Sequence, residues 1–354
     1  MAMRLFSHAE QLAGHLRSEL LRGTWQGIMP GVLTLETQLG VNRNTVQAAL
    51  RLLEGEGLLV PEGMGRARRI RVPDNFAPRS LRLQILPYER SDRTWHVMLD
   101  LQHRLLDAGH NVGVASRTML ELGMDVGRVA HFVEKCEADA WVIISGSREI
   151  LEWFAVQPLP AFALFGRRRK VPIAGIGPDK TPALAEVVQR LAGLGHKRIV
   201  MLMRQEQIMP VPGALGRAFL GELAAQGLPV GDYNLPCWPN SPEGLLACLD
   251  SLFAVSPPTA LIVDEAFLAK AAQHHLARRG IRVPEHVSLV CLDPDPSFDW
   301  YRPRMAHIRW DPRLAVKRIV GWSANVARGK DDRLNNSFKA FFVESGTMGP
   351  PRKH

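Results

Sequence analysis

The sequence has few cysteines and no long hydrophobic run, and both absences limit what the protein can be. Its four cysteines lie far apart and show no C-x-x-C spacing: Cys136, Cys237, Cys248 and Cys291. This distribution argues against a zinc site or a disulfide framework and fits a reducing cytosol. The starting segment MAMRLFSHAEQ lacks the apolar core of a signal peptide, and no run approaches the length of a membrane span. We therefore expect a soluble cytoplasmic protein without a membrane partner.

Motifs of catalysis and of cofactor binding are also missing. The chain has no G-x-S-x-G, no P-loop, no G-x-G-x-x-G and no H-E-x-x-H pattern. His274 and His275 are adjacent, so on a helix they face different sides and cannot share a metal ion. We expect no catalytic activity, no cofactor and no metal.

In contrast, apolar and positively charged residues are plentiful. Hydrophobic residues make up 46% of the 354 residues, which is ample for real cores, and the length favours two or three domains. Lys and Arg exceed Asp and Glu, which gives a formal net charge of +9. Such a charge favours a polyanionic partner, but net charge alone predicts only non-specific attraction.

Residues 40–53, GVNRNTVQAALRLL, have the pattern of the second half of a helix-turn-helix. Gly40 can adopt the left-handed conformation that ends one helix. Asn42 is a good N-cap for the next helix, because its side-chain oxygen can accept an unpaired backbone N–H. Helical spacing predicts a buried face of Val46, Ala49, Leu50 and Leu53.

The opposite face of this helix is polar. It is expected to carry Arg43, Asn44, Gln47 and Arg51. Arginine suits guanine edges, asparagine and glutamine suit adenine edges, and any of them can hold a phosphate. A solvated helix face is the alternative, and the neighbouring segments decide between the two.

Those neighbours are helices expected at residues 7–22 and 32–39 and a hairpin with strands at 58–60 and 67–72. The tip of the hairpin carries Arg66, and Arg68 follows on the returning strand. Beside a recognition helix, a basic hairpin can act as a wing that reaches phosphates or the minor groove. Arginines on an exposed edge strand also deter aggregation, so the hairpin alone is weak evidence. The order of these elements predicts DNA binding.

The stretches AEQLAGHLRSELLRGTW, LGVNRNTVQAALRLLEGEGLL and PEGMGRARRIRV, with the turn at Pro30, closely resemble the GntR-type winged helix. We place this DNA-binding domain at residues 1–72. The family often has a serine and a DNA-contacting arginine in the turn before the second helix. This chain has Gly31 and Leu33 there, so one contact is expected to be missing.

The resemblance also implies roles for individual residues. Arg43 would be the principal base reader. Contacts to base edges or phosphates are implied for Asn44, Thr45 and Gln47. The wing residues Gly65 and Arg66 would enter the minor groove.

After an extended linker at residues 73–80, the pattern changes to short apolar strands that alternate with helices. This alternation is typical of a doubly wound α/β domain with parallel strands, in which ligands bind at the carboxyl ends of the strands. Strands are expected at residues 81–86, 111–115, 140–144, 159–164, 171–176, 198–203, 260–263 and 287–292.

The stretches LAGLGHKRIVML, PPTALIVDEAFLAKAAQHHLARRGIRVPEHVSLVCLD and RPRMAHIRWD resemble the LacI-type effector domain. That domain shares the two-lobed fold of periplasmic sugar-binding proteins. We place it at residues 81–335, followed by a C-terminal tail at 336–354. A GntR-like head on a LacI-like body is known in sugar-utilisation repressors.

In such a fold, loops after successive strands line a cleft between the lobes. The candidate effector-binding residues are Tyr88, Asp92, Ser145, Trp238, Glu265 and Asp293. Carboxylates beside aromatic rings suit a polyhydroxylated ligand, although the same positions also suit helix caps. The sugar-binding pattern is incomplete, since Leu215 replaces an arginine of the family and Glu265 and Ala266 replace an Asn–Asp pair.

Together these features predict a transcriptional regulator, most simply a repressor that binds a double-stranded DNA operator as a homodimer. A small sugar-like effector that prefers the closed lobes would shift the two heads away from the half-site spacing. The alternative is a ligand-independent dimeric regulator with a degenerate pocket, which a sealed or apolar cleft would favour. An enzyme on a doubly wound domain is a third class, and no catalytic motif supports it.

Overall fold

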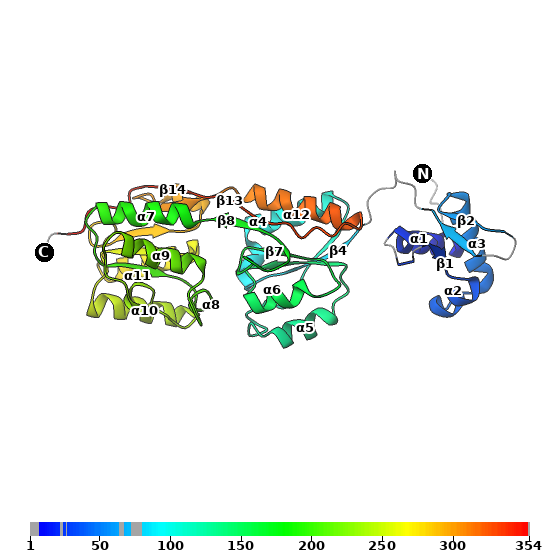
Figure 1. The fold of residues 1–354 in the computed structure, drawn as a ribbon, viewed down its shortest axis with the longest axis horizontal. Helices are drawn as coiled ribbons and strands as arrows, with labels where there is room; N and C mark the ends of the chain where they lie inside the picture. Colours follow the sequence, from blue (N-terminus) through cyan, green and yellow to red (C-terminus); the bar gives the residue numbers. More distant parts are fainter. Residues whose placement is uncertain (1–6, 22–23, 26, 64–66, 72–79, 353–354) are drawn as a thin grey trace.

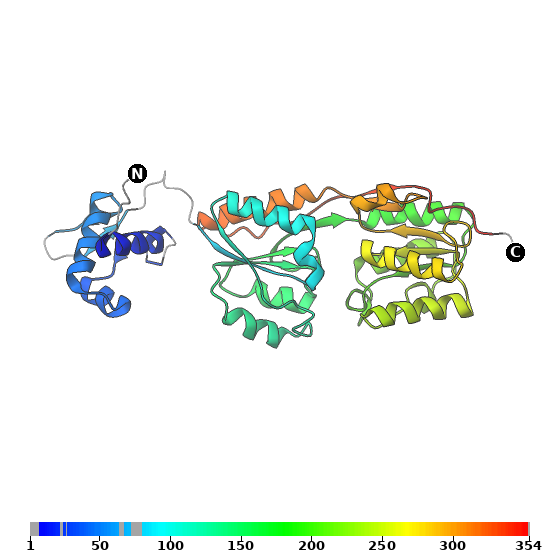
Figure 2. The ribbon, with the colours of Figure 1, turned by 180° about the vertical axis from the view of Figure 1, so that it is seen from behind.

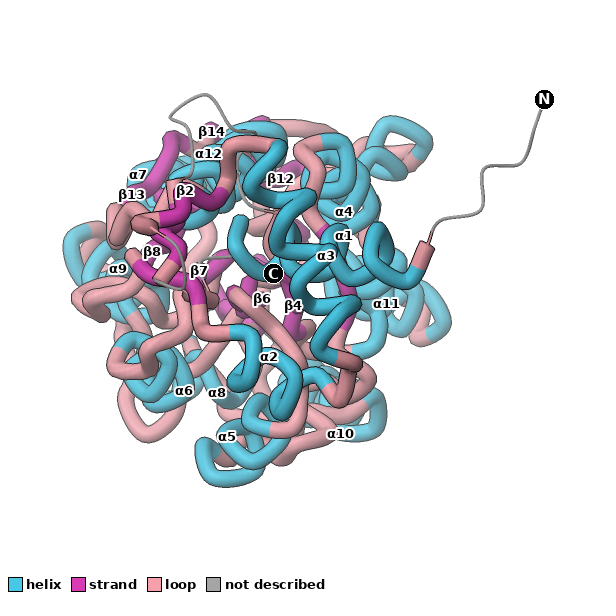
Figure 3. The backbone as a smooth tube through the Cα atoms, turned by 90° about the vertical axis from the view of Figure 1, so that its right-hand side faces the viewer, coloured by secondary structure: helices cyan, strands magenta, loops and turns pink. Residues whose placement is uncertain are grey.

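The structure is a computed structural model that describes residues 7–21, 24–25, 27–63, 67–71 and 80–352. Figures 1 and 2 show three parts along the longest axis: a small N-terminal head and two larger lobes. Figure 3, a view along that axis, shows helices on the outside and most strands toward the centre. The predicted linker at 73–80 lies outside the described residues except for Ser80.

The head consists of three helices and a small antiparallel sheet in the order β1-β3-β2. Its elements are α1 (His8–Leu21), β1 (Ile28–Met29), α2 (Val32–Leu39), α3 (Arg43–Gly55), β2 (Leu59–Pro61) and β3 (Arg68–Ile70). The predicted helices and hairpin are confirmed, whereas the two-residue strand β1 was not expected. Its sequence is too short to show an alternating pattern, and it forms only because it pairs with β3.

The helix-turn-helix follows from local chemistry. Gly40 has φ +63°, so α2 ends in the left-handed conformation that glycine adopts without steric cost. Asn42 Oδ1 accepts the backbone N–H of Asn44 at 2.7 Å, which is the predicted N-cap of α3. The predicted buried face is also confirmed, because each of its residues is fully buried: Val46, Ala49, Leu50 and Leu53. These residues pack against α1.

The first lobe is a six-stranded parallel sheet in the order β13-β8-β7-β6-β4-β5. Its strands are β4 (Arg82–Leu86), β5 (Asn111–Val114), β6 (Ala140–Ile144), β7 (Ala161–Leu164), β8 (Ala174–Asp179) and β13 (Asn335–Lys339). Helices α4 (His96–Asp107) and α12 (Pro312–Ala327) cover one face, and α5 (Val126–Glu134) and α6 (Arg148–Ala155) cover the other (Figure 1). The predicted doubly wound architecture is therefore present in this lobe.

The second lobe is a five-stranded sheet in the order β14-β12-β11-β10-β9, parallel except for β14. Its strands are β9 (Ile199–Leu202), β10 (Ala260–Val263), β11 (Ser288–Cys291), β12 (Ala306–Arg309) and β14 (Phe341–Val343). Helices α7 (Thr181–Gly193) and α9 (Ala214–Ala225) cover one face, and α10 (Pro242–Val255) and α11 (Ala266–Arg278) the other. Short helices η1 (Arg90–Thr94), α8 (Gln205–Ile208), η2 (Asp232–Asn234) and η3 (Pro296–Trp300) lie in loops.

The chain passes between the lobes three times, from β8 to α7, from β12 to α12 and from β13 to β14. Aromatic side chains at this junction contact the cores of both lobes: Trp95, Phe165 and Phe338. The carboxyl ends of both sheets face the junction, so the loops that follow the strands are brought together there.

The prediction of a separate C-terminal tail at 336–354 is wrong, because residues up to 352 belong to the two-lobed body. Strand β13 pairs with β8 and β14 pairs with β12. Thr347 is fully buried, and its hydroxyl donates to Leu289 O at 2.6 Å. The sequence NNSFK shows no hydrophobic alternation, since β13 is an edge strand that pairs with β8 and packs only Phe338 against the cores.

Other differences concern short elements. Helices α6, α10 and α12 and strand β12 were not predicted, and β8 begins three residues later than the expected strand at 171–176. A helix such as α6, with eight residues, offers few positions for a periodic pattern. Four of its side chains are buried against the sheet of the first lobe, a contact that the sequence alone does not reveal: Ile150, Leu151, Phe154 and Ala155.

Candidate DNA-binding surface and inter-lobe site

The outer face of α3 carries cations without an intramolecular partner. Arg43, Asn44 and Arg51 are exposed, and Thr45 and Gln47 are half-buried beside them. Within the described part of the chain, neither Arg43 nor Arg51 makes a side-chain hydrogen bond or an ion pair. An arginine in this state keeps all five N–H donors available for a partner molecule.

Three other arginines of the head, Arg17, Arg68 and Arg69, have partners within it. Arg17 pairs with Glu56 near the end of α3, and Arg68 on β3 pairs with Glu54. Arg68 was predicted to contact DNA, but about a quarter of its side chain is exposed and its Nε donates to that glutamate. The predicted wing residues Gly65 and Arg66 lie outside the described residues.

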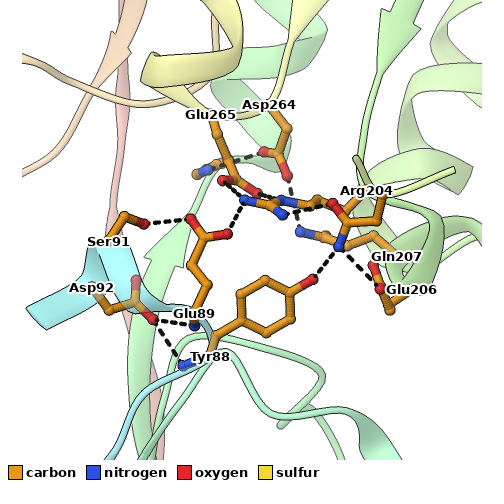
Figure 4. Close-up of polar contacts among 11 residues, drawn as sticks. Tyr88, Glu89, Ser91, Asp92, Arg204, Glu206, Gln207, Asp264 and Glu265 are labelled. Atoms are coloured by element: carbon orange, nitrogen blue, oxygen red, sulfur yellow. Dashed lines mark hydrogen bonds and ion pairs between the residues drawn. The ribbon is translucent and has the colours of Figure 1, made fainter. Parts of the chain in front are cut away.

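A second polar cluster joins the two lobes, and we call it the inter-lobe site: Tyr88, Glu89, Arg204, Asn240 and Glu265. Figure 4 labels all of these residues except Asn240. Tyr88 and Glu89 follow β4 in the first lobe, whereas the other members follow strands or precede helices of the second lobe. Arg204 stands at its centre. Its residue is only 5% exposed, so each of its N–H groups needs an acceptor from the protein.

The guanidinium of Arg204 finds acceptors in both lobes. Its Nε donates to Glu265 Oε1 at 2.8 Å and its Nη2 to Glu265 Oε2 at 3.0 Å, a bidentate pair. Nη2 also donates to Glu89 Oε2 at 2.9 Å, and Nη1 donates to Asn240 Oδ1 at 2.7 Å. Burial lowers the pKa of Arg204, but the hydrogen bonds and charge of Glu265 and the charge of Glu89 outweigh it, so the guanidinium stays charged.

Two aromatic rings lie close to the same guanidinium. The Cζ atom of Arg204 is 5.2 Å from the centroid of the Tyr88 ring and 5.1 Å from that of Phe267, the distances of cation–π contacts. Asn240 Nδ2 donates to the Tyr88 hydroxyl at 3.0 Å, so this amide binds both lobes as well. Two carboxylates, an amide oxygen and two aromatic rings therefore surround the guanidinium.

A neighbouring cluster is built around Lys180, which follows β8 where the chain enters the second lobe. Lys180 Nζ lies 2.7 Å from Asp293 Oδ1 and 3.3 Å from Asp264 Oδ1. Trp310 Nε1 donates to Asp293 Oδ1 at 3.1 Å, and Gln207 Nε2 donates to Asp264 Oδ2 at 3.0 Å. Burial raises the pKa of Asp293, against the lowering effect of Lys180.

The six predicted effector residues divide into three groups. Tyr88 and Glu265 belong to the inter-lobe site, and Asp293 belongs to the lysine cluster beside it. Asp293 was expected to be available to a ligand, or else to cap the loop toward residue 299. Its Oδ1 atom is instead held by Lys180 and Trp310.

The remaining three have local roles. Asp92 Oδ2 accepts the backbone N–H groups of Tyr88 at 2.8 Å and Glu89 at 3.1 Å, so this carboxylate caps its own loop. Burial raises the pKa of Asp92 to about 6. Trp238 was expected in the cleft but lies in the core beneath α10 and α11, at 2% exposure. Ser145 takes up a left-handed turn after β6, with φ +52°.

Four members of these two clusters were not predicted from the sequence: Glu89, Lys180, Arg204 and Asn240. Arg204 and Lys180 follow parallel strands directly, and the rule that ligand sites lie at strand ends could have found them. A polyhydroxylated ligand favours acidic, aromatic and hydroxyl side chains at these positions, so basic residues were not predicted there.

A cavity of about 480 Å³ lies at the opposite edge of the first lobe, not between the lobes. Residues that precede β4, β7 and β8 line it, together with Trp322 and Lys330. In the described ranges, no group of three or more His, Cys, Asp or Glu residues could hold a metal ion. None of the helices in the described part of the chain has the length and apolar character to cross a bilayer.

Two family matches cover separate parts of the chain. Residues 8–68 match the bacterial regulatory proteins of the gntR family, and residues 188–334 match the periplasmic binding protein-like domain. No curated protein sequence matches the chain at a significant level.

Solved structures share the fold. A LacI family transcriptional regulator from Mycobacterium smegmatis has 17% identity and a TM-score of 0.62, over 76% of this chain and 100% of that one. The transcriptional regulator CelR in complex with cellobiose has 17% identity and a TM-score of 0.62, over 90% of this chain and 100% of that one. The lac repressor dimer bound to operator and an anti-inducer has 18% identity and a TM-score of 0.60, over 79% of this chain and 99% of that one.

These matches agree with the geometry of both regions, a winged helix with an open basic face and a two-lobed α/β body. The chain is a transcriptional regulator that joins a gntR-family DNA-binding domain to a LacI-like, periplasmic binding protein-like domain.

Proposed function

We propose that the protein is a repressor that binds a double-stranded operator as a homodimer, with α3 of each head in a major groove. The unpaired cations of α3 carry this proposal. Arg43 and Arg51 are exposed and lack partners among the described residues, while Arg17 and Arg68 of the same head are paired with glutamates. Partnerless arginines on one face of a recognition helix suit the base edges and phosphates of DNA.

Position along α3 divides the roles. Arg43 is the first residue of the helix and suits a guanine edge, with Asn44 and Gln47 beside it on the same face. Thr45 and Arg51 suit phosphates. The family resemblance supports minor-groove contacts by Gly65 and Arg66. We leave Arg68 out of this set, since Glu54 holds its guanidinium.

The neighbours support the remaining parts of the proposal. The lac repressor structure is a dimer on its operator, and CelR binds cellobiose. By analogy, the two-lobed body of this protein would dimerise and transmit the state of its lobes to the heads, with a sugar-like effector acting at the inter-lobe site. We also propose that it acts in the cytoplasm and catalyses no reaction.

A specific observation favours a second candidate, a regulator that needs no ligand. The loops at the carboxyl ends of both sheets already contact each other through Arg204, Asn240 and Arg167. A sugar at the inter-lobe site would have to displace the Arg204 guanidinium from two carboxylates.

In vitro selection of DNA sequences by the full-length protein, followed by sedimentation on the selected duplex, tests the proposal. We expect a palindromic consensus and two protomers for each duplex. Selection of no consensus would refute sequence-specific binding. Titration of the complex with cellobiose, ribose and related sugars then separates the two candidates, because release of DNA favours the effector-controlled repressor and unchanged affinity favours the ligand-independent one.

A further inference from the structure

We propose that the ligand of the inter-lobe site is a guanidinium, and that the chain supplies it from within as Arg204. In this view Arg204 acts as a tethered ligand that holds the lobes together without a diffusible effector. The inference goes beyond the proposed function, because it depends on inter-lobe geometry alone and holds whichever DNA sequence the head binds. Of the two candidates above, it favours the ligand-independent regulator over the one controlled by a sugar-like effector.

The first argument is the number of directed contacts. The Arg204 guanidinium donates four hydrogen bonds: one from Nε, one from Nη1 and two from Nη2. Their acceptors are two carboxylates and one amide oxygen, all in positions that match the planar fork of N–H groups. A lysine ammonium or a sugar hydroxyl could not satisfy this arrangement.

The second argument is the pair of rings. Tyr88 from the first lobe and Phe267 from α11 both lie within 5.2 Å of the Arg204 Cζ atom. Rings of this kind recognise a delocalised cation, and burial strengthens the attraction. The ring and carboxylate contacts together select a flat, positively charged group.

The third argument is the origin of the contacts. Tyr88 and Glu89 belong to the first lobe, whereas Arg204, Glu265 and Phe267 belong to the second. Removal of the guanidinium would therefore leave the Glu89 and Glu265 carboxyl groups near each other without a cation. Once the pH is high enough to ionise Glu265, their repulsion would separate the lobes. Only a cation of similar shape could bring them together again.

An ordinary structural ion pair would show the same contacts in the intact protein, so the test must empty the site and refill it. Arg204→Ala removes two methylene groups and the guanidinium. N-ethylguanidinium has the composition of the excised fragment, and N-ethylurea is its neutral counterpart. Both can be added at equal ionic strength and far below denaturing concentrations.

Two measurements follow the refilling. Isothermal calorimetry should show millimolar binding of N-ethylguanidinium to Arg204→Ala and none to the parent protein. Hydrogen–deuterium exchange of segments 87–95 and 204–211 should rise by roughly tenfold or more in the variant. The exchange should return toward the parent rate with N-ethylguanidinium but not with N-ethylurea.

A control and a second variant sharpen the result. Arg190→Ala removes an exposed arginine that pairs with Glu344, and should change neither segment. Glu89→Gln removes the charge of the first-lobe ion pair and leaves both the Tyr88 ring contact and the Arg204–Glu265 pair inside the second lobe. It should raise exchange in both segments, and N-ethylguanidinium should have no effect on it.

The proposal is overturned if folded Arg204→Ala exchanges like the parent protein, or if N-ethylguanidinium neither binds nor restores protection. If Arg204→Ala does not fold, Glu89→Gln decides, and unchanged exchange in that variant overturns the proposal. DNA binding enters none of these measurements, so failure here leaves the proposed repressor function standing.

Discussion

The arginines of α3 and Arg204 of the second lobe share one side chain but have opposite surroundings. Arg43 and Arg51 are exposed and have no partner among the described residues, whereas Arg204 is buried against two carboxylates, an amide and two rings. The head thus presents its cations to another molecule, and the body satisfies its cation internally. Whether the N–H donors of an arginine are paired within the protein therefore distinguishes a binding surface from an internal contact.

The largest effect is expected when the internal partner is removed. At pH 8, Arg204→Ala should lower the free energy of unfolding of the body by about 3 kcal/mol or more, because it leaves a buried carboxylate without its cation. Urea unfolding followed by tryptophan fluorescence measures the change. Arg190→Ala, at an exposed pair with Glu344, should stay within about 0.5 kcal/mol of the parent protein. Equal losses in the two variants would show that the Arg204 site has no special role.

Removal of an arginine from the open surface should affect DNA binding and not stability. Arg43→Ala should cost roughly 1–3 kcal/mol of binding to the selected operator and relax one base preference, because a bidentate contact to a base edge is lost. Fluorescence anisotropy on operator and scrambled duplexes measures both effects. An equal loss on the two duplexes would mean that Arg43 holds only a phosphate.

The two basic residues farther along the head should differ in their charge effect. Arg51→Ala should reduce the slope of log K against log salt by about one unit, because one phosphate contact releases about one counterion. Arg68→Ala should change the slope less, since Glu54 already balances that charge. A larger change for Arg68 than for Arg51 would place the wing, and not the end of α3, on the backbone.

The smallest effect concerns pH. Burial raises the pKa of Glu265 to about 7, and Arg204 lowers it from a still higher value. An acid with a raised pKa stabilises the fold at low pH, and this stability is lost as the pH rises through the folded-state pKa. Arg204→Ala raises that pKa further, so the penalty should be small below pH 6 and grow toward pH 9.

Between low and high pH, the loss of unfolding free energy caused by Arg204→Ala should increase by about 1.4 kcal/mol for each unit by which the pKa of Glu265 rises in the variant. Unfolding of the parent protein and of Arg204→Ala at four pH values between 5 and 9 measures it. A penalty that shrinks with rising pH would contradict the sign of this linkage and would remove Glu265 as the group responsible.

The sequence was informative where neighbours along the chain decide the structure. Gly40 and Asn42 lie within three residues of the turn they shape, and the buried face of α3 repeats with the helical period. The same is true of β10 and β11, whose apolar runs predicted buried strands. Strand ends also predicted that Tyr88, Glu265 and Asp293 would lie near the junction of the lobes.

The inter-lobe site required the tertiary structure, because its members are far apart in sequence. Arg204 is 36 residues from Asn240, 61 from Glu265 and 115 from Glu89. No local pattern shows that these side chains share one guanidinium. Trp238 illustrates the reverse error, since it was predicted to line the cleft but is buried in the core against residues of α10 and α11.

The sequence by itself determined the winged helix, the alternation of strands and helices and the polar face of α3 that we propose meets DNA, because hydrophobic period, caps and turns act over a few residues. Only the tertiary structure decided that the strands form two sheets, that the last residues complete both, and that Arg204 occupies the space between them. Those outcomes depend on contacts between distant segments, and the charge of a buried side chain has meaning only once its partners are in place.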